Sequence, residues 1–309
     1  MKKEDNSSLK REKKYGLLIV SAILLIVGIA LAVYTYNTTF RESTVVGATL
    51  TEVKAQIKAI EGGTATGDID ALNTQKAALT DEKLRLERPY SYSLTLLFAA
   101  IVLLIKGIFN AVVGVVPVKK TDVKRLAQAG LLAALCYIGF AVFKIDIPVG
   151  TEKTAFHFGN VFCVLAALLI GGYWGGMAGA IGMTIGDLTT SYVTSAPKTF
   201  LLKLCIGLIV GLVAHKIFKL SRQHSAKYVT GVTILASVCG MAFNLFADPV
   251  VGYFYKTYLL GVPQEITSIL VKWSAVTTAV NACIAVVAAT IFYLALRPAL
   301  KKAGLFNEL

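Results

Sequence analysis

Residues 157–216 read His157-Phe-Gly-Asn160, then Gly171-Gly-Tyr-Trp-Gly-Gly-Met-Ala-Gly-Ala-Ile-Gly182, then Asp187, Ala196-Pro-Lys198 and an apolar run that ends at Lys216. This pattern indicates two apolar helices with a short glycine-rich connection, a polar loop and a third apolar helix. Polar side chains stand where the apolar segments meet, and such groups are costly in a bilayer unless they face protein, water or ligand. The segment therefore predicts membrane helices with a few functional polar groups.

The composition is also typical of a membrane protein, with 56% hydrophobic residues, 16% charged residues and a mean hydropathy of +0.68. A helix needs about 20 apolar residues to cross a hydrocarbon core about 30 Å thick, and we find about eight such runs. They lie at 15–33, 93–116, 123–143, 158–170, 177–192, 199–217, 229–247 and 269–297. The sequence therefore predicts an all-α polytopic membrane protein.

The formal net charge of +13 is explained by topology and not by nucleic-acid binding. Basic residues cluster in Lys2–Lys14, Lys119–Arg125, Lys216–Lys227 and Arg297–Lys302. With an even number of spans and both termini cytoplasmic, every cluster falls on the cytoplasmic side, as the positive-inside rule requires. We therefore predict a multi-pass protein of the cell membrane, in contact with the lipid bilayer and with both termini inside.

The chain divides into two predicted units. Residues 1–118 contain two transmembrane helices that flank an outer segment at about 40–90, where apolar residues follow helical spacing around the break at Gly62–Gly67. This spacing predicts an extracellular helical hairpin, interpreted as a spacer or self-association element because it carries no catalytic grouping. Residues 119–309 form a six-span bundle.

Small residues line particular helix faces in the second unit. Gly175, Gly179 and Gly182 belong to one stripe that continues to Gly186, where a neighbouring backbone can approach closely. Packing within the bundle explains this stripe. For Ala129 and Ala133, packing and docking to a separate membrane partner remain alternatives.

Polar and aromatic side chains gather at the predicted outer ends of the second unit's helices, and together they indicate a pocket for a small, flat, polar molecule. The candidate substrate-binding residues are His157, Asn160, Asp187, Tyr192, Lys198, Asn244, Asp248, Tyr253, Trp273, Thr277 and Asn281. Single members of this group also suit structural roles. His157 could cap its helix, Asp187 and Lys198 could form a structural ion pair, and Trp273 or Tyr253 could join the interfacial aromatic belt.

Several functions are not indicated. The five cysteines form no C-x-x-C pair, so neither a disulfide framework nor a metal site is predicted, and we expect no cofactor. The chain lacks the P-loop pattern, so a transporter of this design would need a partner to hydrolyse ATP.

Residues 123–300 resemble the substrate-binding S component of an energy-coupling factor (ECF) vitamin transporter. The resemblance rests on the six spans, on Ala129-x-x-x-Ala133, on His157-Phe-Gly-Asn160 with its glycine-rich turn, on Ser195-Ala-Pro-Lys198 and on Ala247-Asp-Pro249. It implies a vitamin binder that captures its ligand outside and joins a transmembrane coupling subunit and two ATPases. Ala129 and Ala133 would contact the coupling subunit.

The vitamin remains open from the residues alone. The motifs are nearest to the riboflavin and hydroxymethylpyrimidine types, with pantothenate and pyridoxine-like compounds as alternatives. A self-sufficient, ion-coupled secondary transporter is the second hypothesis, although the chain shows no inverted-repeat halves with broken helices. A third hypothesis is an intramembrane enzyme with His157 and Asp187 as acid and base, but we predict a binding protein without catalytic residues.

Overall fold

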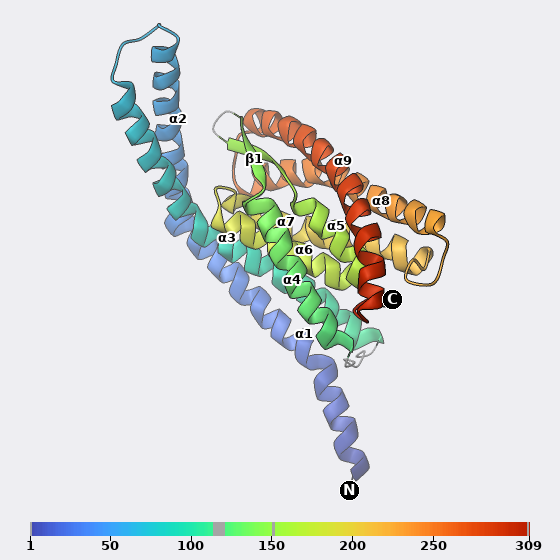
Figure 1. Cartoon of the computed structure of the whole chain (residues 1–309). Helices are drawn as coiled ribbons and strands as arrows, with labels where there is room; N and C mark the ends of the chain where they lie inside the picture. The colour runs from blue at the N-terminus through green and yellow to red at the C-terminus, as the bar shows by residue number, and fades with distance from the viewer. Residues whose placement is uncertain (1, 114–120, 150–151, 308) are drawn as a thin grey trace. The chain divides into compact units, whose positions relative to one another are not determined.

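The computed structural model describes residues 2–113, 121–149, 152–307 and 309, and most of them are helical (Figure 1). The elements in chain order are α1 (Lys2–Thr35), η1 (Tyr36–Phe40), α2 (Arg41–Glu61), α3 (Ile69–Val113), α4 (Thr121–Ala141), β1 (Lys144–Val149), β2 (Glu152–His157), α5 (Gly159–Ile170), α6 (Gly172–Thr189), η2 (Val193–Ser195), α7 (Ala196–Gly211), η3 (Leu212–Ile217), α8 (Ala226–Phe254), η4 (Tyr255–Leu259) and α9 (Gln264–Lys302).

The chain forms two compact units. Unit 1 contains Met1–Pro117 and Val193–Pro197, and unit 2 contains Val118–Tyr192 and Lys198–Leu309. The first predicted basic cluster falls on residues 2–14, whose side chains are not described. In the second cluster, Lys119–Arg125, Lys119 and Lys120 lie outside the described residues.

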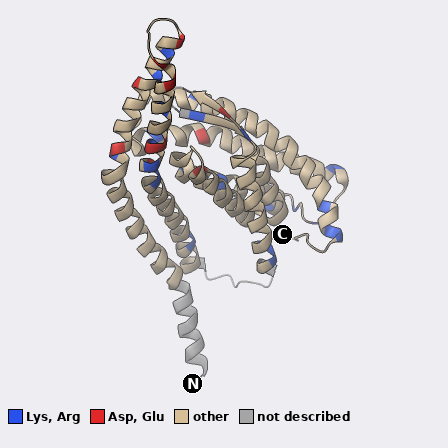
Figure 2. Cartoon of the chain, turned by 60° about the vertical axis from the view of Figure 1, so that its left-hand side comes forward, with Lys and Arg blue, Asp and Glu red and all other residues tan. Residues whose placement is uncertain are grey.

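In unit 1, α1 packs along α3, and small residues bring the two helices close. A Cβ atom added at Gly28 would lie 3.2 Å from the Cα atom of Leu97, and Thr35 Oγ1 donates a hydrogen bond of 3.2 Å to Ser93 Oγ. Further along, α2 packs against the first half of α3 and buries Leu50 and Val53. Both signs of charge alternate along α2 and the first half of α3, whereas the second half of α3 is almost free of charge (Figure 2).

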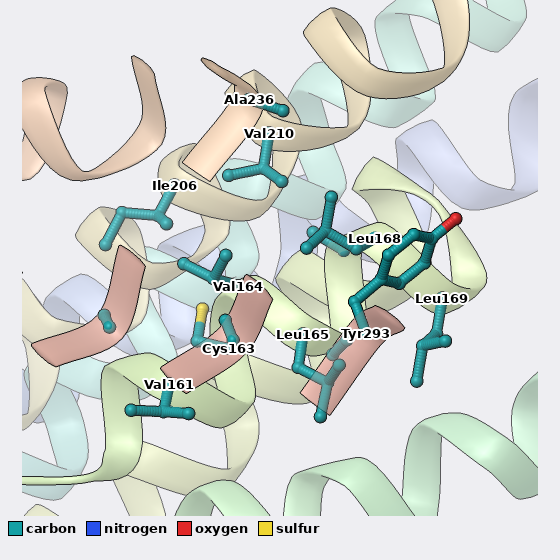
Figure 3. Close-up of a cluster of buried hydrophobic side chains, with 14 of the residues drawn as sticks. Val161, Cys163, Val164, Leu165, Leu168, Leu169, Ile206, Val210, Ala236 and Tyr293 are labelled. Atoms are coloured by element: carbon teal, nitrogen blue, oxygen red, sulfur yellow. The ribbon is translucent and has the colours of Figure 1, made fainter. Parts of the chain in front are cut away.

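In unit 2, the short helix α5 forms the centre of the core. Eleven of its twelve residues are buried, and Val164 and Leu168 lie between Ile206 of α7 and Tyr293 of α9 (Figure 3). Gly171 alone joins α5 to α6, and its φ of +89° is one that glycine adopts without the steric cost of a side chain.

The glycine stripe of α6 packs inside unit 2. A Cβ atom at Gly175 would overlap the backbone of Ala167 on α5, one at Gly179 would overlap the Cys163 sulfur, and one at Gly182 would overlap the Ala133 carbonyl on α4. The prediction that these glycines serve helix packing is confirmed.

Six helices among the described residues are long and apolar enough to cross a membrane, which makes the chain an all-α polytopic membrane protein. Two of the predicted runs are not among the six. Helix α5 has 12 residues and, at 1.5 Å per residue, rises only about 18 Å, too little for the hydrocarbon core. Helix α6 is the second; it has 18 residues, and six of them are glycines.

A β-hairpin connects α4 to α5, and no strand was predicted from the sequence. Strands β1 and β2 are antiparallel, with Lys144 opposite His157 and Val149 opposite Glu152. Ile145, Ile147 and Val149 alternate with other residues in the two-residue period of a strand, but the run is too short to stand out between long apolar helices.

Candidate functional site

The predicted polar residues meet at one end of unit 2, around Phe140 near the end of α4. The Phe140 ring lies 4.9 Å from the His157 ring and 5.8 Å from the Tyr192 ring. A Cβ atom at Gly186 would lie 2.5 Å from this same ring, so the last turns of α6 are also adjacent. The β-hairpin, α4 and the last turns of α6 therefore surround one region.

One part of this region consists of polar groups that bind one another. We name them the anchoring set: Asp146, Thr154, Tyr192, Lys198, Asp248, Ser274, Thr277, Thr278 and Asn281. Its centre is Asp248, whose carboxylate accepts hydrogen bonds from Lys198 Nζ at 2.8 Å, Ser274 Oγ at 2.9 Å and Thr278 Oγ1 at 3.1 Å. Asp248 therefore ties α8 to α7 and α9. The ion pair that Lys198 forms is with Asp248 and not with Asp187.

The rest of the anchoring set holds the β-hairpin to the helices. Asn281 on α9 accepts a hydrogen bond from the His157 backbone N–H and donates one to the Ala155 carbonyl, each at 3.0 Å. The Thr277 and Thr154 hydroxyls lie 2.6 Å apart. Tyr192 donates a 2.9 Å hydrogen bond from its hydroxyl to Asp146 on β1. Polar atoms of these side chains therefore already have hydrogen-bond partners within the protein.

A second group of buried polar atoms has no hydrogen-bond partner in the described part of the chain. We name these residues the unpaired set: His157 (Nδ1), Asn160 (Oδ1), Thr184 (Oγ1), Asp187 (Oδ2) and Asn244 (Oδ1). Asn160, Asp187 and Asn244 are each 2% exposed. A buried polar atom without a partner costs about 1–3 kcal/mol, so a molecule that supplies partners here would be bound favourably.

The imidazole of His157 is uncharged at neutral pH. Burial, and then the nearby ammonium of Lys203, lowers the pKa of His157 to about 3. A neutral ring keeps one nitrogen as a donor and the other as an acceptor. His157 is therefore equipped to hydrogen-bond a neutral ligand.

Lys203, one turn after Thr199 on α7, was not among the residues predicted from the sequence. It is 7% exposed and lies within electrostatic reach of His157, Asp187 and Asp248. The signal was present, because a single lysine inside an apolar run is expensive in a membrane and marks a functional position.

Two predicted residues, Trp273 and Tyr253, are not members of the unpaired set. Trp273 is 48% exposed on α9, which fits the aromatic-belt alternative, and we leave it out of the site. Tyr253 is half-buried, and its ring meets the Phe254 ring edge-on at 5.8 Å.

The predicted docking residues also differ in placement from the expectation. Ala129 is 7% exposed and belongs to the core, and Ala133 packs against Gly182. The exposed small residues of α4 are Ala127, Gly130 and Ala134. The two faces are one residue apart in sequence, which is a rotation of about 100° around a helix, so small-residue spacing alone does not choose between them.

Comparison with protein families gives one match. The model of the family described as "ECF-type riboflavin transporter, S component" matches residues 119–298, which make up more than half of the chain and contain the entire unpaired set. No curated protein and no solved structure matches the chain.

Proposed function

Because the chain belongs to the family of ECF-type riboflavin transporter S components, we propose that unit 2 binds riboflavin and delivers it to an ATP-driven importer. The family is one of transporter subunits and not of enzymes. The observation that carries the proposal is the unpaired set, whose five residues belong to the buried polar groups without a partner in the described part of the family region and include three of the substrate-binding residues predicted at the helix ends, Asn160, Asp187 and Asn244.

The chemistry of riboflavin suits this set. Its ring system is flat and largely apolar, and it carries carbonyl oxygens, ring nitrogens and one N–H along its edges. The Asn160 and Asn244 amides and the His157 ring can meet such groups with either donors or acceptors. The aromatic ring of Phe140, beside His157 and Tyr192, offers the flat apolar contact.

We propose a topology in which both termini are cytoplasmic and the unpaired set opens to the outside. If α5 and α6 do not each span the bilayer, the number of crossings falls from eight to the six of the longer helices. The number stays even, so the termini remain on one side. The mixed charges of α2 and the first half of α3 support a hairpin outside the membrane, preceded and followed by the two additional spans of unit 1.

The energy for transport would come from partners, namely a transmembrane coupling subunit and two ATPases, because the chain has no P-loop pattern. For docking to the coupling subunit we propose the exposed face of Ala127, Gly130 and Ala134 on α4. A Cβ atom added at Gly130 would meet nothing within 4 Å, so a partner helix has room to approach closely.

The docking face is tested by replacing Ala134 with Trp. We expect riboflavin binding to persist and uptake by cells or vesicles containing the complete transporter to be lost, because the indole would hold the coupling subunit away. Ala133→Trp is the matched comparison and should instead destabilise the fold by clashing with α6. Full uptake by Ala134→Trp would place docking elsewhere.

The function itself is tested by purifying the full chain in mild detergent and identifying co-purified small molecules by mass spectrometry. We expect riboflavin at a stoichiometric amount, or binding of added riboflavin with quenching of its fluorescence. An empty protein that gains no thermal stability from riboflavin or other B vitamins would contradict the proposal.

A further inference from the structure

Two charged residues in the site, Asp187 and Lys203, take part in none of the ion pairs found among the described residues of unit 2. Asp187 is 2% exposed and Lys203 is 7% exposed. No ion pair joins them in the described part of the chain, although each contributes to the electrostatic environment of the other. The neighbouring charged residues form ion pairs with each other: Lys198 pairs with Asp248 at 2.8 Å, and Lys144 pairs with Asp146 at 3.2 Å.

The helices place the two groups along one side of the site. The hydroxyl group of Thr199 on α7 lies near the carboxyl group of Asp187, which is in the last turn of α6. Lys203 follows Thr199 by four residues, which is about 6 Å further along the same face of α7. The carbonyl of Lys203 accepts a 3.7 Å hydrogen bond from Cys163, and Asn160 lies one turn before Cys163 on α5.

A second observation is that two buried oxygen atoms here have no hydrogen-bond partner in the described part of the chain. Asp187 retains an oxygen without a partner, and so does Asn160 on the adjoining helix. A buried carboxyl group and a buried amino group that lie within electrostatic reach of each other and form no ion pair in the described part of the chain favour a neutral ligand group that donates to one and accepts from the other. A ligand with only acceptors or only donors along this edge would leave one of the two groups unsatisfied.

We propose that Asp187 and Lys203 together recognise an amide-type edge of the ligand, in which an N–H stands next to a C=O, as in a lactam, an imide or a ureide. Asp187 accepts the hydrogen bond from the N–H, and Lys203 donates to the adjacent carbonyl oxygen. The proposal rests on the function proposed above, because it concerns the same site. In riboflavin this edge is the imide of the pyrimidine ring, whose N–H is flanked by two carbonyls.

The test compares riboflavin with riboflavin methylated at the imide nitrogen, using fluorescence or calorimetric titration of the purified full chain. The methyl group removes the donor and keeps both carbonyls. We expect at least about a tenfold weaker binding of the methylated compound, since a site built around a hydrogen bond rejects an analogue that lacks it. 5-Deazariboflavin, which keeps the imide edge and loses a ring nitrogen elsewhere, is the control ligand and should bind more tightly than the methylated compound.

Two variants distinguish recognition of the imide N–H from steric exclusion of the methyl group. Asp187→Ala should weaken riboflavin binding and leave binding of the methylated compound unchanged or improved. Lys203→Met should weaken both compounds by a similar factor, because both retain the carbonyl oxygen. Lys272→Met, which removes an exposed lysine of α9, is the matched control and should change neither affinity.

The outcomes distinguish this inference from the proposed function. If wild-type protein binds neither riboflavin nor its analogues, the proposed substrate is wrong, and the inference fails with it. If wild-type protein binds riboflavin and the methylated compound equally, only the inference is overturned. The same holds if Asp187→Ala weakens the two compounds alike. The comparison of ligands on wild-type protein requires no variant, so the test stands even where a variant fails to fold.

Discussion

The anchoring set and the unpaired set occupy the same end of unit 2 and differ in what their polar atoms contact. Asp248 accepts three hydrogen bonds and Asn281 makes two, whereas Asn160 and Asn244 each bury an oxygen that contacts no donor in the described part of the chain. Groups that are already paired contribute to stability, and groups that are not are available to a ligand. A residue's type and position in the sequence do not reveal this difference.

The largest effect is expected from Lys198→Met, which leaves the carboxylate of Asp248 buried without its cation. We expect a loss of about 3–5 kcal/mol in the free energy of unfolding, measured by denaturant titration in detergent. The double variant Lys198→Met with Asp248→Leu should recover much of this loss. A Lys198→Met protein as stable as wild type would remove Lys198 from the anchoring set.

A smaller loss is expected from Asn281→Leu. The substitution removes both hydrogen bonds that Asn281 makes to β2 and should cost about 2 kcal/mol. It should also speed amide hydrogen exchange along Lys144–His157 while exchange in α5 stays slow. Unchanged exchange in the β-hairpin would show that Asn281 does not hold it.

In contrast, we do not expect Asn244→Leu to destabilise the protein without ligand. No hydrogen bond to the Asn244 oxygen is lost, and an apolar group replaces a buried atom without a partner, so stability should stay within about 1 kcal/mol of wild type or rise. The same denaturant titration checks this. A loss as large as that of Asn281→Leu would mean that Asn244 is also an anchor.

His157 introduces a dependence of stability on pH, which is small near neutral pH and grows as the pH falls. Its pKa is lowered to about 3 in the folded chain, so the unfolded chain binds a proton more readily between about pH 3 and its ordinary value near 6.5. Stability is fully present above pH 6.5 and declines as the pH falls through this window. His157→Gln should flatten this part of the profile of unfolding free energy against pH, and an unchanged profile would contradict the assignment.

Much of the fold was predictable because membrane helices have a strong one-dimensional signal. Long apolar runs identified α1, α3, α7, α8 and α9, and the spacing of the glycines identified the packing face of α6. The β-hairpin was not predictable in the same way. Its strands have six residues each, and its position depends on Asn281, which lies more than 120 residues away from Ala155 in sequence.

The site was predictable as a region and not as a set of contacts. The sequence indicated that His157, Asp187 and Asn244 belong together, because polar residues at helix ends converge in a bundle. It did not indicate that Lys198 is neutralised by Asp248, since that depends on how α7 and α8 pack. Lys203 was detectable as a lone cation in an apolar run, but its environment was not. The inward orientation of Ala133 likewise required the position of Gly182.

The most direct test of the central claim is to measure riboflavin affinity for wild-type protein and for Asn244→Leu and Asn281→Leu by titration, with unfolding stability measured on the same samples. We expect Asn244→Leu to lose at least about tenfold in affinity with its stability retained, because a hydrogen bond to the ligand is removed. Asn281→Leu should mainly lose stability. The claim that the unpaired set binds the ligand would be contradicted if Asn244→Leu bound riboflavin as tightly as wild type and binding weakened only in Asn281→Leu, together with its stability.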